Sequence, residues 1–329
     1  MGRDSKIEWT THTFNPWIGC TKVSPGCAHC YAEARMDHRF GQVKWGPGQP
    51  RRRTSAANWR LPVRWNKEAA GAVERPRVFC ASLADVFDAE GPADARSDLF
   101  ALIEATPNLD WLLLTKRPEN ILPMVPESWR TAWPEHAWIG TTVEDQKRAD
   151  ERIPHLLRVP ARVRFLSCEP LLGSVDLENL AAEGIGLPGW FSALMPTAIT
   201  PALSWVIAGG ESGAGARPMH PNWARALRDQ CAHAGVPYLF KQWGEWAPLN
   251  DGPGADLDMG RYGKPAASAG FFDYCDRWNG PDVPHGDRIG DLGPNERMRS
   301  NPFRQTMGHV GKHAAGRLLD GAQHDGYPA

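Results

Sequence analysis

The chain has 329 residues, of which 42% are hydrophobic and 23% charged, and its formal net charge is −1. This balance is typical of a globular protein with a substantial core, and it excludes a strongly basic nucleic-acid coat or a polybasic membrane anchor. No apolar run approaches the roughly 20 residues that cross a bilayer, and no apolar signal core stands near the start, so we expect no membrane partner and a cytoplasmic location.

Short, apolar segments rich in β-branched residues recur along the chain and predict seven strands, at 16–20, 77–82, 111–115, 137–142, 163–169, 205–211 and 237–243. Apolar residues at helical spacing predict helices between the strands, at 95–107, 145–160 and 221–237. Strands that alternate with helices predict an α/β fold with a parallel sheet, a partial or complete TIM-like (β/α) barrel with long loop insertions.

We expect the barrel to occupy residues 1–249, with insertions at 41–66 and 179–203, both rich in Gly and Pro. Residues 250–300 are rich in Gly, Pro and Asp, which predicts an irregular loop. The remainder of the 250–329 segment is expected to return and pack on the barrel.

Nearly every predicted strand ends in polar or reactive residues: Ser82, Asp85, Lys116, Arg117, Thr142, Glu144, Glu169, Glu211, Lys241 and Gln242. The carboxyl ends of parallel strands converge on one mouth of a barrel, where such folds keep their chemistry. We therefore expect one shared site there, although loops after strands are polar in general.

Three of the seven cysteines, Cys20, Cys27 and Cys30, follow the first predicted strand with the spacing C-x6-C-x2-C. In the reducing cytoplasm that we expect for this chain, the cluster favours a metal over a disulfide. Zinc would need a fourth ligand, such as His29 or His12. A [4Fe-4S] cluster can take three thiolates and leave one iron open, so the lack of a fourth nearby cysteine favours the cluster.

The cysteine pattern resembles that of the radical S-adenosylmethionine superfamily, although six residues separate the first two cysteines where the usual number is three. The chain more closely resembles the phage-associated three-cysteine-motif family, a radical-SAM-like family of unknown function. That resemblance covers most of the chain, through "WTTHTFNPWIGCTKVSPGCAHCYAE", "VFCASLADVFD", "LLLTKRP", "WIGTTVEDQKRADERIP", "RFLSCEPLLG", "VIAGGESGAGARPM", "LFKQWGEW" and "VGKHAAGRLLDG". It implies a barrel, a [4Fe-4S] cluster and S-adenosylmethionine, whose amino and carboxylate groups would bind the open iron.

By the same resemblance, Gly209, Gly210 and Glu211 echo a glycine-glycine-glutamate element that holds the methionine amino group, although that element usually follows the second strand. A tight turn with a solvated glutamate is the alternative. Glu169 is placed to hold a ribose or an ammonium group, and the other expected cofactor contacts are Ser82, Asp85 and Thr142. No residue is assigned a catalytic role, and the candidates are Cys168, Lys116 and Lys241.

Arginines and tryptophans alternate in the first insertion, at Arg51, Arg52, Arg53, Trp59, Arg60 and Trp65. Such a mixture can bind a phosphate backbone and stack on bases, whereas an exposed, solvated loop is the structural alternative.

The sequence therefore favours a radical-SAM-like iron–sulfur enzyme that starts a radical reaction by reductive cleavage of S-adenosylmethionine. Its expected substrate is a nucleic acid or nucleotide, and its expected partners are a separately encoded protein and an external electron donor. The alternative is a non-catalytic barrel, stabilised by an iron–sulfur cluster or zinc, that binds nucleic acid or protein.

Overall fold

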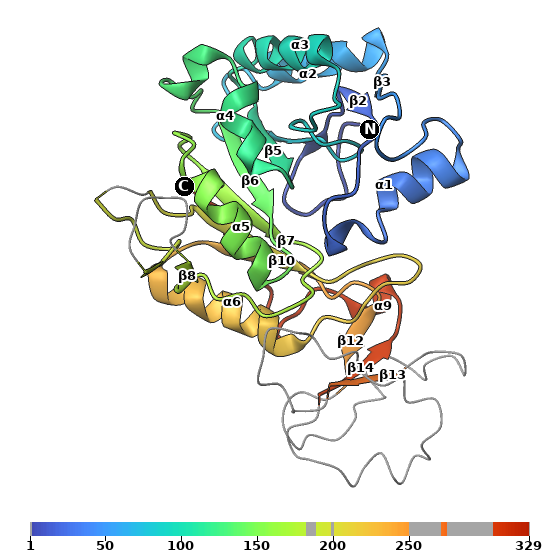
Figure 1. Cartoon of the computed structure of the whole chain (residues 1–329), viewed down its shortest axis with the longest axis vertical. Helices are drawn as coiled ribbons and strands as arrows, with labels where there is room; N and C mark the ends of the chain where they lie inside the picture. The colour runs from blue at the N-terminus through green and yellow to red at the C-terminus, as the bar shows by residue number, and fades with distance from the viewer. Residues whose placement is uncertain (1, 182–188, 199–200, 250–270, 275–304, 329) are drawn as a thin grey trace, which may run out of the picture.

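A computed structural model describes residues 2–181, 189–198, 201–249, 271–274 and 305–328. Its centre is a seven-stranded parallel sheet that curls into a half-barrel (Figure 1). The strand order is β1 (His12–Thr13), β4 (Arg77–Cys80), β5 (Asp110–Thr115), β6 (Ala137–Thr142), β7 (Arg164–Cys168), β10 (Trp205–Gly209) and β11 (Tyr238–Gln242). The α/β class and the partial barrel predicted from the sequence are confirmed.

The first strand of this sheet differs from the prediction. β1 precedes the predicted segment 16–20, which instead contributes β2 (Trp17–Ile18), paired antiparallel with β3 (Arg52–Arg53). Pro16 separates the two strands and has no N–H to donate to a sheet ladder. The apolar pair of β2 is buried outside the main sheet, beneath the insertion that the sequence placed at 41–66.

Helices join successive strands and cover the outer face of the sheet (Figure 1). The three predicted helices are present as α3 (Ala93–Glu104), α5 (Gln146–Leu157) and α6 (Pro221–Ala234). The insertion also contains α2 (Ala56–Glu68), which was expected as loop. Ser55 caps α2 by accepting a hydrogen bond from the Asn58 N–H, and the internal Pro62 obscured the helix in the sequence.

The shorter elements of the barrel region lie in its connections. They are η1 (Pro25–Cys27), α1 (Tyr31–Glu33), the π-helix η2 (Ala34–Arg39), η3 (Pro118–Asn120), α4 (Ile121–Met124) and η4 (Glu127–Arg130). In the second insertion, β8 (Leu180–Ala181) pairs antiparallel with β9 (Trp190–Phe191). Residues 182–188 and 199–200 of that insertion lie outside the described residues.

The inner face of the sheet has its own aromatic core, which includes Trp9, Phe79, Phe165 and Trp205. The rings of Trp9 and Phe79 lie 4.6 Å apart, and both side chains are buried. Trp9 and Phe79 also line the cavity at the mouth of the half-barrel, so this core forms the cavity's apolar floor.

The C-terminal part forms a small antiparallel sheet of β12 (Trp246–Pro248), β14 (Gln305–His309) and β13 (Phe271–Tyr274), followed by α9 (Lys312–Ala315). The last residues return to the half-barrel, where Phe240 N donates to His324 O at 2.9 Å and Trp205 Nε1 donates to Gly326 O at 2.7 Å. The loop predicted at 250–300 lies, apart from β13, outside the described residues.

Across the described ranges, none of the helices combines the length and apolar character that a bilayer span requires.

Candidate functional site

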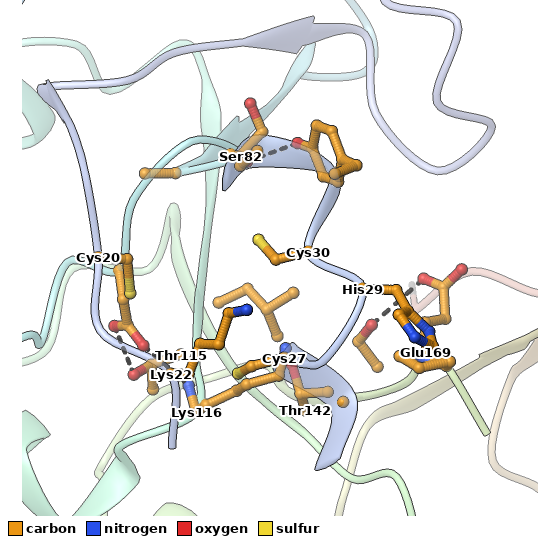
Figure 2. Close-up of a pocket in the computed structure, with 18 of the residues that line it drawn as sticks. Cys20, Lys22, Cys27, His29, Cys30, Ser82, Thr115, Lys116, Thr142 and Glu169 are labelled. Atoms are coloured by element: carbon orange, nitrogen blue, oxygen red, sulfur yellow. Dashed lines mark hydrogen bonds between the residues drawn. The ribbon is translucent and has the colours of Figure 1, made fainter. Parts of the chain in front are cut away.

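A cavity of about 260 Å³ lies at the carboxyl ends of the parallel strands. It brings together most of the predicted site residues: Cys20, Cys27, Cys30, Ser82, Asp85, Lys116, Thr142, Glu169, Gly210, Glu211 and Lys241. Figure 2 shows the three cysteines bordering this space, with Lys116, Thr142 and Glu169 among the side chains around it. The residues come from segments far apart in the chain, and the parallel topology places them at one edge of the sheet.

Three residues predicted for this site, Cys168, Gly209 and Glu144, do not line the cavity. Cys168 is fully buried in the core between sheet and helices, and burial raises the pKa of its thiol well above the ordinary value. Cys168 is therefore an inert thiol that does not line the cavity. Gly209 packs behind Glu169, where an added Cβ would lie 2.9 Å from the Glu169 Oε1 atom.

The loop that carries the cysteines is anchored to the end of β6 through Glu144. Ser24 Oγ donates a hydrogen bond to Glu144 Oε1, and Gly26 approaches the same side chain so closely that a Cβ would lie 2.5 Å from Glu144 Cγ. Glu144 is fully buried, and its other oxygen accepts a hydrogen bond from Arg152 Nη1 at 2.6 Å. A rigid, paired carboxylate thus fixes the loop beside Cys27.

A second anchor joins the cysteine loop to the end of β10. His29 Nδ1 lies 3.2 Å from Glu211 Oε2. Arg217 donates hydrogen bonds to both oxygens of Glu211, from Nε to Oε2 at 2.8 Å and from Nη2 to Oε1 at 2.6 Å. Arg217 Nη2 also donates to Pro25 O at 3.0 Å. Burial would raise the pKa of Glu211, but the hydrogen bonds from Arg217 and His29 outweigh it and hold that pKa below its usual value.

A third anchor surrounds Cys20. Arg117 Nη1 lies 3.6 Å from Cys20 Sγ and 2.9 Å from Asp85 Oδ2, while Arg117 Nη2 donates to Thr21 O at 2.7 Å. Asp85 also accepts from Thr115 Oγ1 at 2.7 Å, so this carboxylate orients the guanidinium toward the sulfur. Burial raises the pKa of the Cys20 thiol to about 12, with Asp85 adding to the rise and Arg117 opposing it.

The remaining polar groups of the cavity have spare capacity for a ligand. Lys116 Nζ donates to Thr142 Oγ1 at 3.3 Å and forms no ion pair with any described residue. Glu169 has one oxygen 2.9 Å from Lys241 Nζ and the other 3.2 Å from Ser167 Oγ. Gln242 is 6% exposed, and its Oε1 has no hydrogen-bond donor in the described part of the chain. A buried, unpaired amide oxygen in a cavity wall is the kind of acceptor that a bound molecule satisfies.

Three thiols on one cavity form a donor set suited to an iron–sulfur cluster or another soft metal. Positive charge lies near two of the three sulfurs. Arg117 lies beside Cys20. Burial raises the pKa of the Cys30 thiol, and the positive charge of Lys116 opposes that rise. Within the described ranges, no three His, Cys, Asp or Glu side chains converge closely enough to hold a metal ion. The three cysteine sulfurs are therefore ligands of the right chemical type for an iron–sulfur cluster, but they line the cavity apart from one another.

The two imidazoles considered as zinc ligands differ in position. His29 lines the cavity, whereas His12 is buried outside it, stacked on Trp65 with ring centroids 4.3 Å apart. His12 therefore belongs to the core, and burial lowers its pKa.

The Arg and Trp candidates for nucleic-acid contact do not act as one surface. The Arg51 side chain is fully buried, with Nη2 2.9 Å from Asp88 and 2.8 Å from Glu90, and Trp65 is 2% exposed. Burial removes these two side chains from the predicted nucleic-acid surface. Arg53 lies over the Trp59 ring, 4.4 Å from its centroid, and pairs with Asp98, while Arg52 and Arg60 are exposed.

Sequence reasoning missed Ser24, Gly26 and Arg217 as parts of the site. Ser24 and Gly26 lie between Cys20 and Cys27, and the six-residue spacing was a signal that could have pointed to them, because so long a loop needs contacts that hold it in place. Arg217 offered no such signal, since it stands in a loop six residues beyond Glu211.

The chain belongs to the family described as protein of unknown function (DUF5131), whose model matches residues 4–328. No functionally curated protein and no solved structure matches it. Function must therefore be argued from the cavity itself.

Proposed function

We propose that this protein is a radical-SAM-type iron–sulfur enzyme in which Cys20, Cys27 and Cys30 hold a [4Fe-4S] cluster. One observation carries the proposal: the only three cysteines among the described residues that line the cavity stand on one firmly anchored loop at the mouth of a parallel half-barrel. Three thiolates without a fourth leave one iron free for a ligand. We assign the half-barrel to the TIM-like (β/α) type on the same grounds.

When bound there, the reduced cluster would supply the electron that cleaves S-adenosylmethionine and starts a radical reaction. The protein's own residues orient that cofactor and exclude water from it. Lys116, a cation without an ion pair among the described residues, is suited to a carboxylate. Glu169 and the unpaired oxygen of Gln242 are suited to an ammonium group or ribose hydroxyls.

The glutamate of the glycine-glycine-glutamate element has a different role in this proposal. Both oxygens of Glu211 are already engaged by Arg217, so Glu211 positions the cysteine loop. The neighbouring Gly210 lets its strand end pass close to another backbone segment, because an added Cβ would lie 1.9 Å from the Trp243 carbonyl oxygen. We therefore assign the methionine amino group to Glu169, whose Oε1 accepts no hydrogen bond from the described residues, rather than to Glu211.

The partners follow from this chemistry. Reduction of the cluster requires an external electron donor, and free thiols suit a reducing, cytoplasmic compartment. We also propose a nucleic acid or nucleotide as substrate and a separately encoded protein as a further partner.

The test is anaerobic reconstitution of the full chain with iron and sulfide, followed by iron, sulfide and zinc analysis. The wild-type protein should retain four irons and four sulfides per chain, and the triple variant Cys20→Ala, Cys27→Ala, Cys30→Ala should retain essentially none. Cys231→Ala is the matched control, because this thiol is buried in α6 away from the cavity. Retention of one zinc per chain and no sulfide would instead support a non-catalytic binding module.

A further inference from the structure

A second hollow, of about 960 Å³, adjoins the candidate site. It lies between the N-terminal residues 2–7, the 31–42 segment that follows the cysteines, and β3. We call it the basic groove. Figure 1 shows the three segments that form it close together on one side of the half-barrel, in blue.

The groove concentrates positive charge on a chain whose formal net charge is −1. Five basic side chains line it, against a single acidic one, Asp4. The five are Arg3, Lys6, Arg35, Arg52 and Arg53. Such a local excess attracts an anion at a defined place and not over the whole surface.

Three of these cations are available to a ligand. Arg3 pairs with Glu68, and Arg53 pairs with Asp94 and Asp98. Lys6, Arg35 and Arg52 are exposed and form no ion pair with any residue in the described ranges. Among the described residues, the Arg52 side chain donates a hydrogen bond to the neutral side chain of Gln42, at 2.6 Å, and to no acidic group.

Two aromatic side chains stand beside the cations, and the guanidinium carbons of Arg35 and Arg39 lie 5.8 Å and 5.4 Å from the centroid of one of them, the Phe40 ring. Tyr31 is 54% exposed and Phe40 is 47% exposed, and both line the groove. Exposed aromatic residues among cations are the recurring means of binding single-stranded nucleic acid, because bases stack on the rings while the cations hold the phosphates.

The groove is joined to the cavity that holds the cysteines. Tyr31 and Ser82 line both hollows, and the Tyr31 hydroxyl donates to Ser82 O. Tyr31 directly follows Cys30 in the sequence, so a molecule that binds to Tyr31 in the groove lies beside the loop that carries the cysteines.

We infer that the basic groove binds a single-stranded oligonucleotide, with its phosphates on Lys6, Arg35 and Arg52 and its bases on Tyr31 and Phe40. One nucleotide of the bound strand then reaches past Tyr31 into the cavity. The choice of substrate for chemistry rests on the proposed function, whereas binding in the groove does not require the cluster.

The test is fluorescence anisotropy with a fluorescein-labelled 12-nucleotide single-stranded DNA, using the full chain as purified and again after cluster reconstitution. The double variant Arg35→Ala, Arg52→Ala should bind at least tenfold more weakly, and its logarithmic salt dependence should be less steep by about 1.4. Tyr31→Ala should weaken binding by about tenfold through lost stacking, and Tyr31→Phe should retain most of it. Arg130→Ala is the matched control, because this exposed arginine on η4 lines neither hollow.

Circular dichroism and thermal melting confirm that each variant is folded. Absence of binding by the wild-type chain at 100 mM salt, or equal affinity of the wild type and the double variant, would overturn the inference. Equally strong competition by inorganic polyphosphate, which has no bases, would also overturn it. Oligonucleotide binding by a chain that takes up no iron would support the groove and count against the proposed cluster, so the two failures are separable.

Discussion

Gly26 offers the sharpest structural test of how the cysteine loop is held. An alanine Cβ there would lie 2.5 Å from Glu144 Cγ and 2.6 Å from Glu144 Oε1, far closer than atoms pack. Glu144 cannot withdraw, since it is fully buried and Arg152 Nη1 holds its other oxygen at 2.6 Å. Arg152 is fixed in turn by a hydrogen bond to Thr142 O at 2.7 Å.

The loop must therefore move when Gly26 becomes alanine. Overpacking of this kind costs about 1–3 kcal/mol. We expect Gly26→Ala to lower the free energy of unfolding by about that amount in urea titrations. Because Cys27 is the next residue, we also expect the variant to retain less iron after reconstitution than the wild type.

Gly2→Ala is the control, because an added Cβ at Gly2 meets no atom within 4 Å. Unchanged urea unfolding together with unchanged iron content in Gly26→Ala would refute the role assigned to Glu144 as a rigid anchor of the loop.

Three further predictions concern the other anchors and the pH dependence. Glu211→Gln weakens the contacts of Glu211 with Arg217 and His29, so amide hydrogen exchange in residues 20–30 should accelerate about tenfold; an unchanged exchange rate would contradict the second anchor. The pKa of Cys20 is raised to about 12, so in the metal-free chain its alkylation by iodoacetamide should be slow at pH 8 and accelerate up to about pH 12; rapid labelling at pH 8 would contradict this. Burial lowers the pKa of His220 to about 4, and its Nδ1 caps α6 by accepting from Asn222 N. The His220 imidazole therefore binds a proton more readily in the unfolded chain than in the folded one, and the free energy of unfolding should fall as the pH drops from about 6.5 to 4. In His220→Asn that fall should be less steep. Parallel pH profiles of the variant and the wild type would count against this role of His220.

The parallel sheet was predictable because its strands are continuous apolar runs bounded by polar residues, as in "WLLLT" and "AWIGTT". β1 was not, since the two residues His12–Thr13 carry no apolar pattern of their own. Their place in the sheet comes from pairing with Val78 and Phe79, which is a tertiary effect.

The gathering of strand-end residues at one cavity followed from topology alone, because carboxyl ends of parallel strands share an edge. The separate roles of these residues within the cavity could not be predicted from the topology. Asp85 and Glu211 have the residue type of ligand-binding carboxylates, yet both are engaged in orienting arginines. Only the three-dimensional contacts distinguish them from Glu169, which is held by a lysine and a serine.

The roles of the arginines in the first insertion could not be predicted from the sequence either. Arg51 and Arg52 are neighbours in the sequence, but Arg51, which directly precedes β3, is buried against Asp88, whereas Arg52 within β3 faces the groove. Composition indicated a basic segment and could not divide it into core and surface.

The most direct test of the proposed function is an anaerobic electron paramagnetic resonance spectrum of the reconstituted, reduced chain, recorded with and without S-adenosylmethionine. We predict the signal of a reduced [4Fe-4S] cluster that changes when S-adenosylmethionine is added, because the ligand binds the iron that the three cysteines leave free. A cluster signal that is identical with and without S-adenosylmethionine, or a protein that takes up zinc and no iron, would contradict it.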